Sequence, residues 1–219
     1  MSNRQQIDAM LQTIDIECSY TKGFTGRSSL LPEVMEAMRL VLRHDFVPPS
    51  LAAMAYENTP LPIGKGQTIS QPFIVALMTD LLCPEKGDVI LEVGAGSGYQ
   101  AAILSLLVRQ VYTIEIIPDL ADRAKELLQR LGYGNIEVRQ GDGYNGWPKH
   151  APFDGIIVTA AATHVPPSLK EQLKPGGKLI VPIGQPYMPQ ELLVLEKDQQ
   201  GVFCTRNVLP VSFVPLTRA

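Results

Sequence analysis

The first residues that could do chemistry lie in the glycine-rich segment LEVGAGSG, residues 91–98, between an apolar run and a helical pattern. Glycines at such a point let the backbone turn tightly and approach a ligand at the carboxyl edge of a sheet. The spacing is G-x-G-x-G, and a carboxylate precedes the first glycine by two residues, where it would repel the pyrophosphate of a dinucleotide. The segment therefore favours a cofactor without phosphate; a strand-to-helix turn without a ligand is the alternative. The candidate cofactor contacts in it are Glu92, Gly94, Gly96 and Gly98.

Two more acidic residues follow the next two apolar runs. Glu115 lies 21 positions after Gly94, where a carboxylate can accept hydrogen bonds from both hydroxyls of a ribose, and a solvated strand-end glutamate is the alternative. Asp142 could accept a hydrogen bond from an adenine amino group, and Gly143 leaves room for the ring. Three such strand ends on one edge predict an adenosine site. S-adenosylmethionine fits it best, because it carries adenosine, a cationic sulfonium and an amino acid but no phosphate.

The candidate residues at the ends of these apolar runs can share one edge only if the runs are parallel strands of one sheet. From residue 88 onward short apolar runs alternate with helical patterns, which predicts a doubly wound α/β fold with a mostly parallel sheet covered on both faces. The last two apolar runs have no helix between them, which predicts an antiparallel hairpin at the sheet edge and an antiparallel final strand. The expected strands are residues 88–93, 110–116, 135–140, 153–159, 178–184, 191–197 and 202–216, and the expected helices are residues 97–108, 118–132 and 165–177.

Residues 1–87 are expected to form a helical N-terminal region with an active-site loop, and residues 88–219 a cofactor-binding core. Apolar residues recur at helical spacing over residues 30–44. The segment AYENTPLPIGKGQTIS, residues 55–70, is too irregular for a helix, which predicts a long loop of the kind that often carries function. It ends at Ser70, before a helical pattern with Pro72 in its first turn, so that the serine could also be an N-cap.

The composition limits the class of protein. A chain of 219 residues with 45% hydrophobic and 19% charged residues is expected to fold as a single domain. It has neither a long apolar stretch nor a secretion signal at its start, so we expect a cytoplasmic protein without a membrane partner. The three cysteines are widely separated and lack ligand spacing, so no metal is expected. Lys and Arg total 19 against 22 Asp and Glu, without a basic cluster, which disfavours a nucleic-acid partner, and a monomer is expected.

Six motifs, spread over nearly the whole chain, carry a family resemblance: they are FVPP, AYENTPLPIGKGQTISQP, LEVGAGSGYQAAIL, GDGYNGWPKHAPFDGIIVTAAA, LKPGGKLIVPIG and FVPLT. Through them the chain resembles the protein-L-isoaspartate O-methyltransferases. The glycine motif is shared by many methyltransferases, whereas the loop PLPIGKGQTISQP looks specific to this family. The resemblance implies a class I methyltransferase fold, S-adenosylmethionine as donor, and methyl transfer to the α-carboxylate of L-isoaspartyl residues in damaged proteins and peptides.

By this resemblance, Ser70 matches the family's active-site serine, and Gln67, Thr68 and Ile69 line with it the place where cofactor and substrate meet. Donors at Thr68 and Ser70 could hold one oxygen of the substrate carboxylate while the other oxygen attacks. An α-carboxyl group has a reference pKa of about 3.3–3.7 and is ionised at neutral pH, so the reaction needs no general base.

Small residues after the fourth expected strand, Thr159 and Ala160 among them, could let a peptide backbone pass close to the methyl group, and plain packing is the alternative. Two other functions are open. A methyltransferase of the same fold that acts on RNA or another substrate is disfavoured by the lack of a basic patch. A cofactor-binding module without catalysis is disfavoured by the intact QTIS loop.

Overall fold

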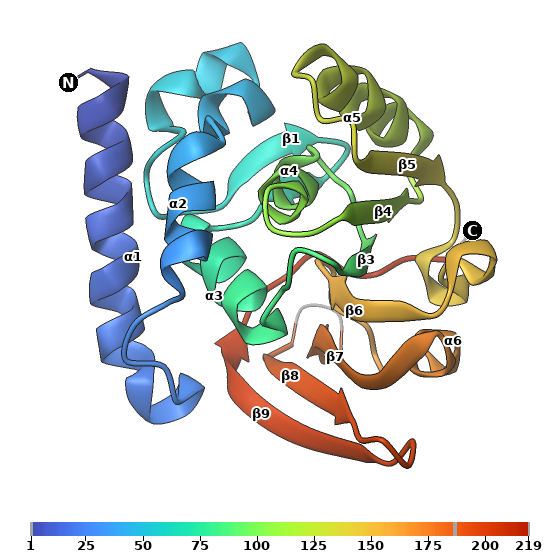
Figure 1. Ribbon diagram of the computed structural model, residues 1–219. Helices are drawn as coiled ribbons and strands as arrows, with labels where there is room; N and C mark the ends of the chain where they lie inside the picture. The colour runs from blue at the N-terminus through green and yellow to red at the C-terminus, as the bar shows by residue number, and fades with distance from the viewer. Residues whose placement is uncertain (1, 186–187, 219) are drawn as a thin grey trace.

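Within residues 2–185 and 188–218, which the computed structural model describes, seven strands form a twisted sheet at the centre of the molecule (Figure 1). Their order across the sheet is β5-β4-β3-β6-β7-β8-β9. The strands are β3 (Val89–Val93), β4 (Gln110–Glu115), β5 (Ile136–Gln140), β6 (Phe153–Val158), β7 (Leu173–Ile183), β8 (Gln190–Lys197) and β9 (Phe203–Val211).

The sheet is mostly parallel, as predicted. All pairings from β5 to β7 are parallel, whereas β7 with β8 and β8 with β9 pair antiparallel, which confirms the expected edge hairpin. After β3 the chain adds β4 on one side and later β6 on the other, so that the strand order reverses between β3 and β6. Open α/β sheets bind their ligands at such a reversal, outside the carboxyl ends of the strands.

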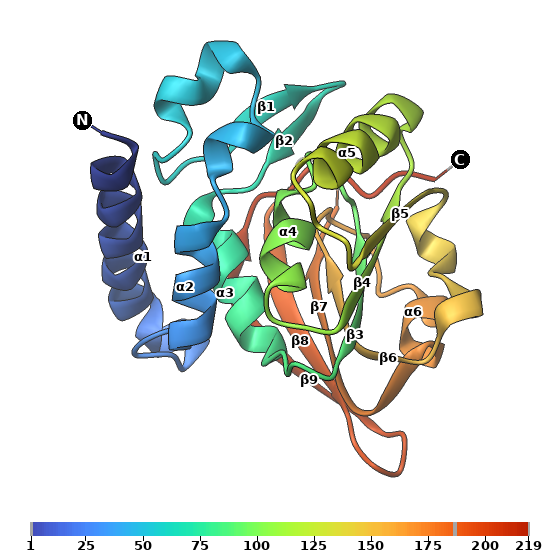
Figure 2. The same cartoon turned by 45° about the horizontal axis from the view of Figure 1, so that its top comes forward.

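Both faces of the sheet are covered, which explains why its strands are almost continuously apolar. Ile90 and Ile157 point into the core beneath the helices α3 (Pro72–Leu82), α4 (Tyr99–Ser105) and α5 (Pro118–Arg130). Their neighbours Leu91 and Ile156 point to the opposite face, where α6 (Pro167–Glu171) packs. Figure 2 shows these two helical layers on either side of the strands.

The best-punctuated helix forms as its residues predict. Pro118 opens α5, where a missing N–H costs nothing, and Gly132 takes a left-handed conformation with φ of 84° just after the helix. The buried residues of α5 lie on one face and pack toward the sheet: they are Leu120, Ala121, Ala124 and Leu128.

The N-terminal region is helical, as expected. The long helix α1 (Asn3–Thr25) begins with a capping box between Ser2 and Gln5, and it is followed by α2 (Pro32–Leu40) and the 3-10 turns η1 (Arg43–Phe46) and η2 (Pro49–Met54). The helix expected over residues 30–44 therefore ends earlier, at Leu40, and the following residues turn inward. Within the described residues no helix combines the length and hydropathy needed to cross a membrane.

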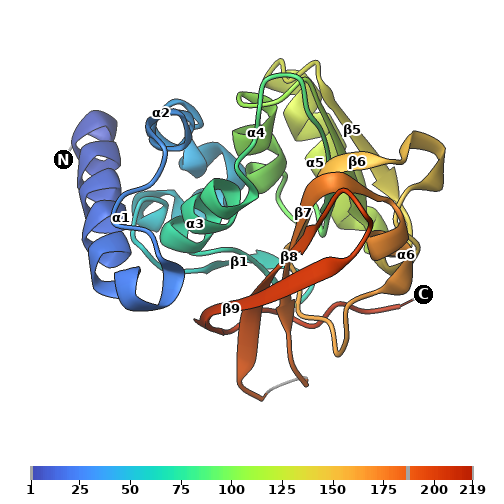
Figure 3. The same cartoon turned by 60° about the horizontal axis from the view of Figure 1, so that its bottom comes forward.

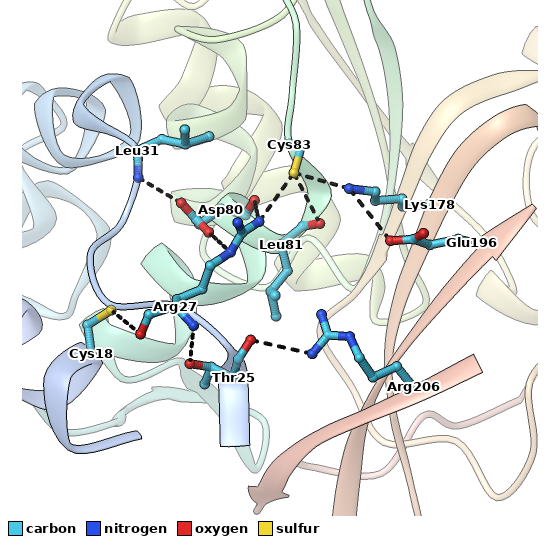
Figure 4. A network of polar contacts seen from close by, with 10 residues as sticks. All are labelled: Cys18, Thr25, Arg27, Leu31, Asp80, Leu81, Cys83, Lys178, Glu196 and Arg206. Carbon is cyan, nitrogen blue, oxygen red and sulfur yellow. Dashed lines mark hydrogen bonds and ion pairs between the residues drawn. The ribbon is translucent and has the colours of Figure 1, made fainter. Parts of the chain in front are cut away.

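A polar network fixes α1 to the rest of the molecule (Figure 4). Arg27, just after α1, forms an ion pair of 2.7 Å with Asp80 of α3, whose side chain is 1% exposed. The second oxygen of Asp80 accepts a hydrogen bond from the backbone of Leu31, and Arg206 of β9 reaches the carbonyl of Thr25. Because Asp80 is buried, loss of Arg27 would leave a desolvated charge, which makes this contact hard to break.

Other segments also differ from their predictions, and the strand expected over residues 202–216 ends at Val211. The loop expected over residues 55–70 contains a hairpin of β1 (Leu61–Gly64) and β2 (Gln67–Ile69), in which buried and exposed residues alternate over only four positions of β1. Such a short alternation is masked by its prolines and glycines. The helix expected over residues 165–177 ends at Glu171, because Leu173 already pairs with Phe153 and begins β7.

Candidate functional site

A cleft opens at the carboxyl ends of the strands, where the strand order reverses. Its walls come from the ends of β3, β4 and β6, from Gly143, from the hairpin β1–β2 and from the C-terminal tail. The lining residues are Gln67, Thr68, Val93, Gly94, Gly96, Ile114, Glu115, Ile116, Ile117, Gly143, Thr159, Ala160, Val214, Pro215, Leu216 and Thr217. The structure therefore brings together most of the residues that the sequence proposes as a site.

Two glycines of the motif form the floor of this cleft. Gly94 has φ of 102°, and a Cβ there would lie 2.4 Å from Thr159 Oγ1, so a side chain does not fit. The N–H of Gly96 donates a 2.8 Å hydrogen bond to Glu115 Oε2. Gly98 has a different place: it is the N-cap of α4, its Cβ would press on Leu128 at 3.1 Å, and it does not line the cleft.

Glu115 closes β4 and is held rigidly at the edge of the cleft. Its side chain is 6% exposed, and its two oxygens accept hydrogen bonds from the backbone N–H groups of Gly96 and Ile117, at 2.8 and 3.0 Å. Each carboxylate oxygen can accept two hydrogen bonds, so one lone pair on each remains for a ligand. This arrangement suits the two adjacent hydroxyls of a ribose.

Glu92 lies deeper, on β3, facing a smaller cavity between the glycine motif, α4 and the end of β2. Its side chain is fully buried, and neither carboxylate oxygen has a hydrogen-bond partner in the described parts of the chain. Burial raises the pKa of Glu92 to about 8. Glu92 is therefore mostly neutral at pH 7 while the site is empty, and a ligand that brings a positive charge or hydrogen-bond donors would favour its ionised form.

At the third acidic strand end, after β5, Gly143 and Asp142 have different positions relative to the cleft. Gly143 lines the cleft, and a Cβ there would lie 2.3 Å from Val93 Cγ1, so only glycine fits beside β3. Asp142 does not line the cleft. Its carboxylate accepts a 2.9 Å hydrogen bond from the backbone of Tyr144 and so caps the short turn η3 (Gly143–Asn145).

Three hydroxyl residues lie where the cofactor cleft meets a second, larger cavity. Thr68 and Thr159 line the cleft, the cavity beside Glu92 and the larger cavity, and Ser70 lines the last two. The hydroxyl of Thr159 donates to the carbonyl of Gly94 at 2.6 Å. The hydroxyl of Ser70 makes no hydrogen bond to the residues that the structure describes, so it is available to a ligand from either cavity.

The structure excludes helix capping as a role of Ser70. The N-cap of α3 is Gln71, which makes no side-chain capping bond, and the free N–H of Phe73 instead donates to Asn58 Oδ1 at 3.0 Å. The N-cap prediction for Ser70 was therefore wrong. A residue 15 positions earlier in the chain performs the capping, because the hairpin folds back onto the start of the helix.

The backbone of Ser70 is held by a residue that the sequence did not single out. Arg43 is fully buried, and its guanidinium donates to the carbonyls of Ala55, Thr59 and Ser70, the last two at 3.1 and 3.0 Å. It also lies 6.0 Å from the ring centre of Tyr99, the first residue of α4. Burial lowers the pKa of Arg43 to about 10, so it stays charged at neutral pH. In the sequence it appeared only as part of a helical pattern.

The hairpin β1–β2 crosses from the N-terminal region to α5, as Figure 2 shows. At its tip Arg123 of α5 donates to the carbonyl of Ile63 at 3.2 Å, and Lys65 pairs with Asp119 at 2.5 Å. These contacts hold the hairpin beside the cleft to which it contributes Gln67 and Thr68.

The C-terminal tail was also missed as a wall of the site. Ala161 donates its N–H to the carbonyl of Val214, and Leu216 donates to the carbonyl of Ala161, both at 2.8 Å. The tail thus runs along the segment after β6 and closes one side of the cleft. The sequence pattern predicts one strand over residues 202–216, whereas the structure ends β9 at Val211, and the motif FVPLT has no role in that prediction beyond the family resemblance.

The comparisons with known proteins agree with this geometry. The family model described as "Protein-L-isoaspartate(D-aspartate) O-methyltransferase (PCMT)" matches residues 25–219. The chain belongs to this family. It is 59% identical over 208 residues to "Protein-L-isoaspartate O-methyltransferase 2" of Syntrophobacter fumaroxidans, covering 95% of this chain and 84% of the relative. It is 54% identical over 208 residues to the protein of that name from Polaromonas sp., covering 95% and 99%.

Solved structures confirm the class I methyltransferase fold of this family member. One "protein-L-isoaspartate O-methyltransferase" superposes with a TM-score of 0.80 at 27% identity, covering 95% of this chain and 65% of that one. A putative protein-L-isoaspartate O-methyltransferase from Plasmodium falciparum, in complex with S-adenosyl-L-homocysteine, gives a TM-score of 0.76 at 25% identity, covering 96% and 98%.

Proposed function

We propose that this chain transfers a methyl group from S-adenosylmethionine to the α-carboxylate of L-isoaspartyl residues in damaged proteins and peptides. The observation that carries the proposal is the junction of the two cavities at Thr68, Ser70 and Thr159, in a chain that belongs to this family over residues 25–219. One cavity suits the cofactor, and the other opens beside it for a peptide.

The cleft fits S-adenosylmethionine at three points. Glu115 has one lone pair left on each oxygen for the ribose hydroxyls, and Gly143, packed against Val93 of β3, lines the wall of the same cleft. Glu92 offers a buried carboxyl group without a partner, and the positive groups of the methionine part would favour its ionised form. Two assignments from the sequence stay predictions: Asp142 to the adenine amino group, and Gly98 to the cofactor. Neither residue lines the cleft.

When bound, the cofactor supplies a methyl group on a cationic sulfur. The nucleophile is already ionised at neutral pH, since an α-carboxyl group has a reference pKa of about 3.3–3.7. The task of this chain is therefore to orient the carboxylate and to exclude water, which can contribute as much as about 7–11 kcal/mol. We propose that the hydroxyls of Ser70 and Thr68 hold one carboxylate oxygen and leave the other free. Neutral donors suit this task, because a cationic clamp would weaken the nucleophile.

The proposal is tested with labelled S-adenosylmethionine and a short peptide that contains one L-isoaspartyl residue. The expected product is a carboxyl methyl ester, so that mild alkali should release the label as methanol. Label that resists alkali, or label transferred to RNA and not to the peptide, would contradict the proposal.

We further propose that the protein acts as a monomer in the cytoplasm, as one domain, without a metal, membrane or nucleic-acid partner. The chain has 22 acidic and 19 basic residues, which supports the absence of a nucleic-acid partner, because a nucleic-acid backbone attracts basic surfaces. Light scattering after size exclusion should give a mass near 24.0 kDa, and a mass of twice that value would contradict the monomer.

A further inference from the structure

The larger cavity beside the site has about 560 Å³ of internal space and is bounded mostly by apolar and neutral residues. Its walls come from the start of α3, from β9 and the tail that follows, and from α1, which contacts β9 (Figure 3). Its lining residues are Glu17, Thr21, Pro60, Thr68, Ser70, Gln71, Phe73, Ile74, Thr159, Leu209, Pro210, Val211, Ser212, Phe213 and Val214.

Glu17 is the one ionisable side chain among the described residues that line this cavity. It is half-buried, and its carboxylate forms no ion pair or hydrogen bond within residues 2–185 and 188–218. Apart from the backbone hydrogen bonds of α1, its carbonyl accepts a hydrogen bond from the hydroxyl of Thr21 at 2.8 Å. A carboxylate in an apolar wall is less screened than one on an open surface, so its charge acts on whatever occupies the cavity.

The position of Glu17 is fixed by the fold. Ile14 and Cys18, which flank it on α1, are fully buried, so that the helix cannot turn about its axis without exposing them. The end of α1 is held by the ion pair of Arg27 with Asp80 and by Arg206. Glu17 also lies before residue 25, outside the span that the family model matches, so family membership does not imply it.

We propose that this cavity receives the residues that flank the isoaspartate, and that Glu17 makes the enzyme prefer substrates with a Lys or Arg there over substrates with an Asp or Glu. The inference rests on the proposed function and names the kind of peptide which that site takes. The apolar walls can cover the aliphatic stem of a Lys or Arg while its charged end reaches Glu17. An acidic residue at the same place would meet a like charge, which disfavours it.

The effect is expected to be moderate, because Glu17 is only half-buried. A pair of this kind changes affinity by roughly 2- to 5-fold, so a lysine peptide and a glutamate peptide should differ by about 4- to 25-fold in kcat/KM. The difference should lie in KM and in peptide affinity, while kcat should stay the same, since Glu17 does not touch the reacting atoms.

The test uses isoaspartyl peptides in which one position, at one or two residues before or after the isoaspartate, is Lys, Gln or Glu. Steady-state kinetics give kcat and KM, and fluorescence anisotropy in the presence of S-adenosyl-L-homocysteine gives peptide Kd without turnover. At one or more positions we expect the order Lys, Gln, Glu. Glu17→Gln should remove the preference, and Glu17→Lys should reverse it. Asp15→Asn is the control, because Asp15 lies on α1 but does not line the cavity.

The possible results separate the two proposals. A wild-type enzyme that methylates all the isoaspartyl peptides equally, or a charge preference that persists in Glu17→Gln, would overturn the role of Glu17 and leave the proposed function intact. Failure of the wild-type enzyme to methylate any isoaspartyl peptide would instead refute the proposed function.

Discussion

Replacing Arg43 with lysine tests whether the buried guanidinium positions the active-site segment. The guanidinium contacts three carbonyls with two nitrogen atoms, Nη1 with that of Ala55 and Nη2 with those of Thr59 and Ser70, whereas the three donors of a lysine share a single nitrogen. We expect Arg43→Lys to lose one charge-assisted hydrogen bond and therefore to lower the free energy of unfolding by about 1.5–3 kcal/mol. A domain with a stability of about 5–15 kcal/mol can tolerate that loss and still fold.

The second consequence of Arg43→Lys concerns Ser70, whose carbonyl is one of the three acceptors. Displacement of this backbone should lower kcat by about 10- to 100-fold at a temperature where the variant is fully folded, since methyl transfer depends on alignment. Urea unfolding measures the stability, and calorimetry with S-adenosyl-L-homocysteine should show a smaller change in affinity. Leu169→Ala is the control, because it opens a cavity of similar cost on the opposite face of the sheet. Equal kcat in Arg43→Lys and the wild type would refute the positioning role.

Three other predictions concern single residues in and beside the site. Ser70→Ala should leave the melting temperature unchanged and lower kcat. Asn58→Ala should instead cost about 0.5–2 kcal/mol of stability by thermal unfolding, because Asn58 caps α3. A loss of stability in Ser70→Ala and none in Asn58→Ala would restore the capping role of the serine. Folding raises the pKa of Glu92 from 4.5 to about 8. In the protein without cofactor, the contribution of this group to stability should therefore be complete below pH 4.5 and be lost as the pH rises through 8. Glu92→Gln should remove this part of the pH dependence of urea unfolding. Glu115→Ala should weaken S-adenosyl-L-homocysteine binding by about 1.5–3 kcal/mol in calorimetry, and unchanged affinity in a folded variant would remove Glu115 from the site.

The parts of the fold that the sequence predicted depend on local patterns. The strands that carry Ile90 and Ile157 are short apolar runs between turn residues, and α5 has both a proline at its start and a glycine after its end. Each feature lies within one stretch of chain. Once the strands are parallel, their carboxyl ends share an edge, so the convergence of Gly94, Glu115 and Gly143 also follows from the order of elements.

The parts that it did not predict depend on contacts between distant residues. Asn58 caps a helix that begins 14 positions later, and Arg43 holds the carbonyl of a residue 27 positions away. Neither contact leaves a periodic pattern, and an arginine in a helical pattern is ordinarily expected on the surface. The C-terminal tail has no element of its own along the cleft, so its place depends on its bonds to Ala161. The role of Ser70 was ambiguous in the sequence because a serine suits both helix capping and substrate binding.

The central claim is that the junction at Ser70 receives the carboxylate of an isoaspartyl residue. The most direct test compares kcat/KM for two peptides of identical sequence, one with an L-isoaspartyl and one with an ordinary aspartyl linkage. An isoaspartyl residue presents a backbone lengthened by one methylene and a carboxylate shortened by one, so a site built for it should methylate the isoaspartyl peptide and leave the aspartyl peptide almost unmodified. Equal kcat/KM for the two peptides would contradict the account.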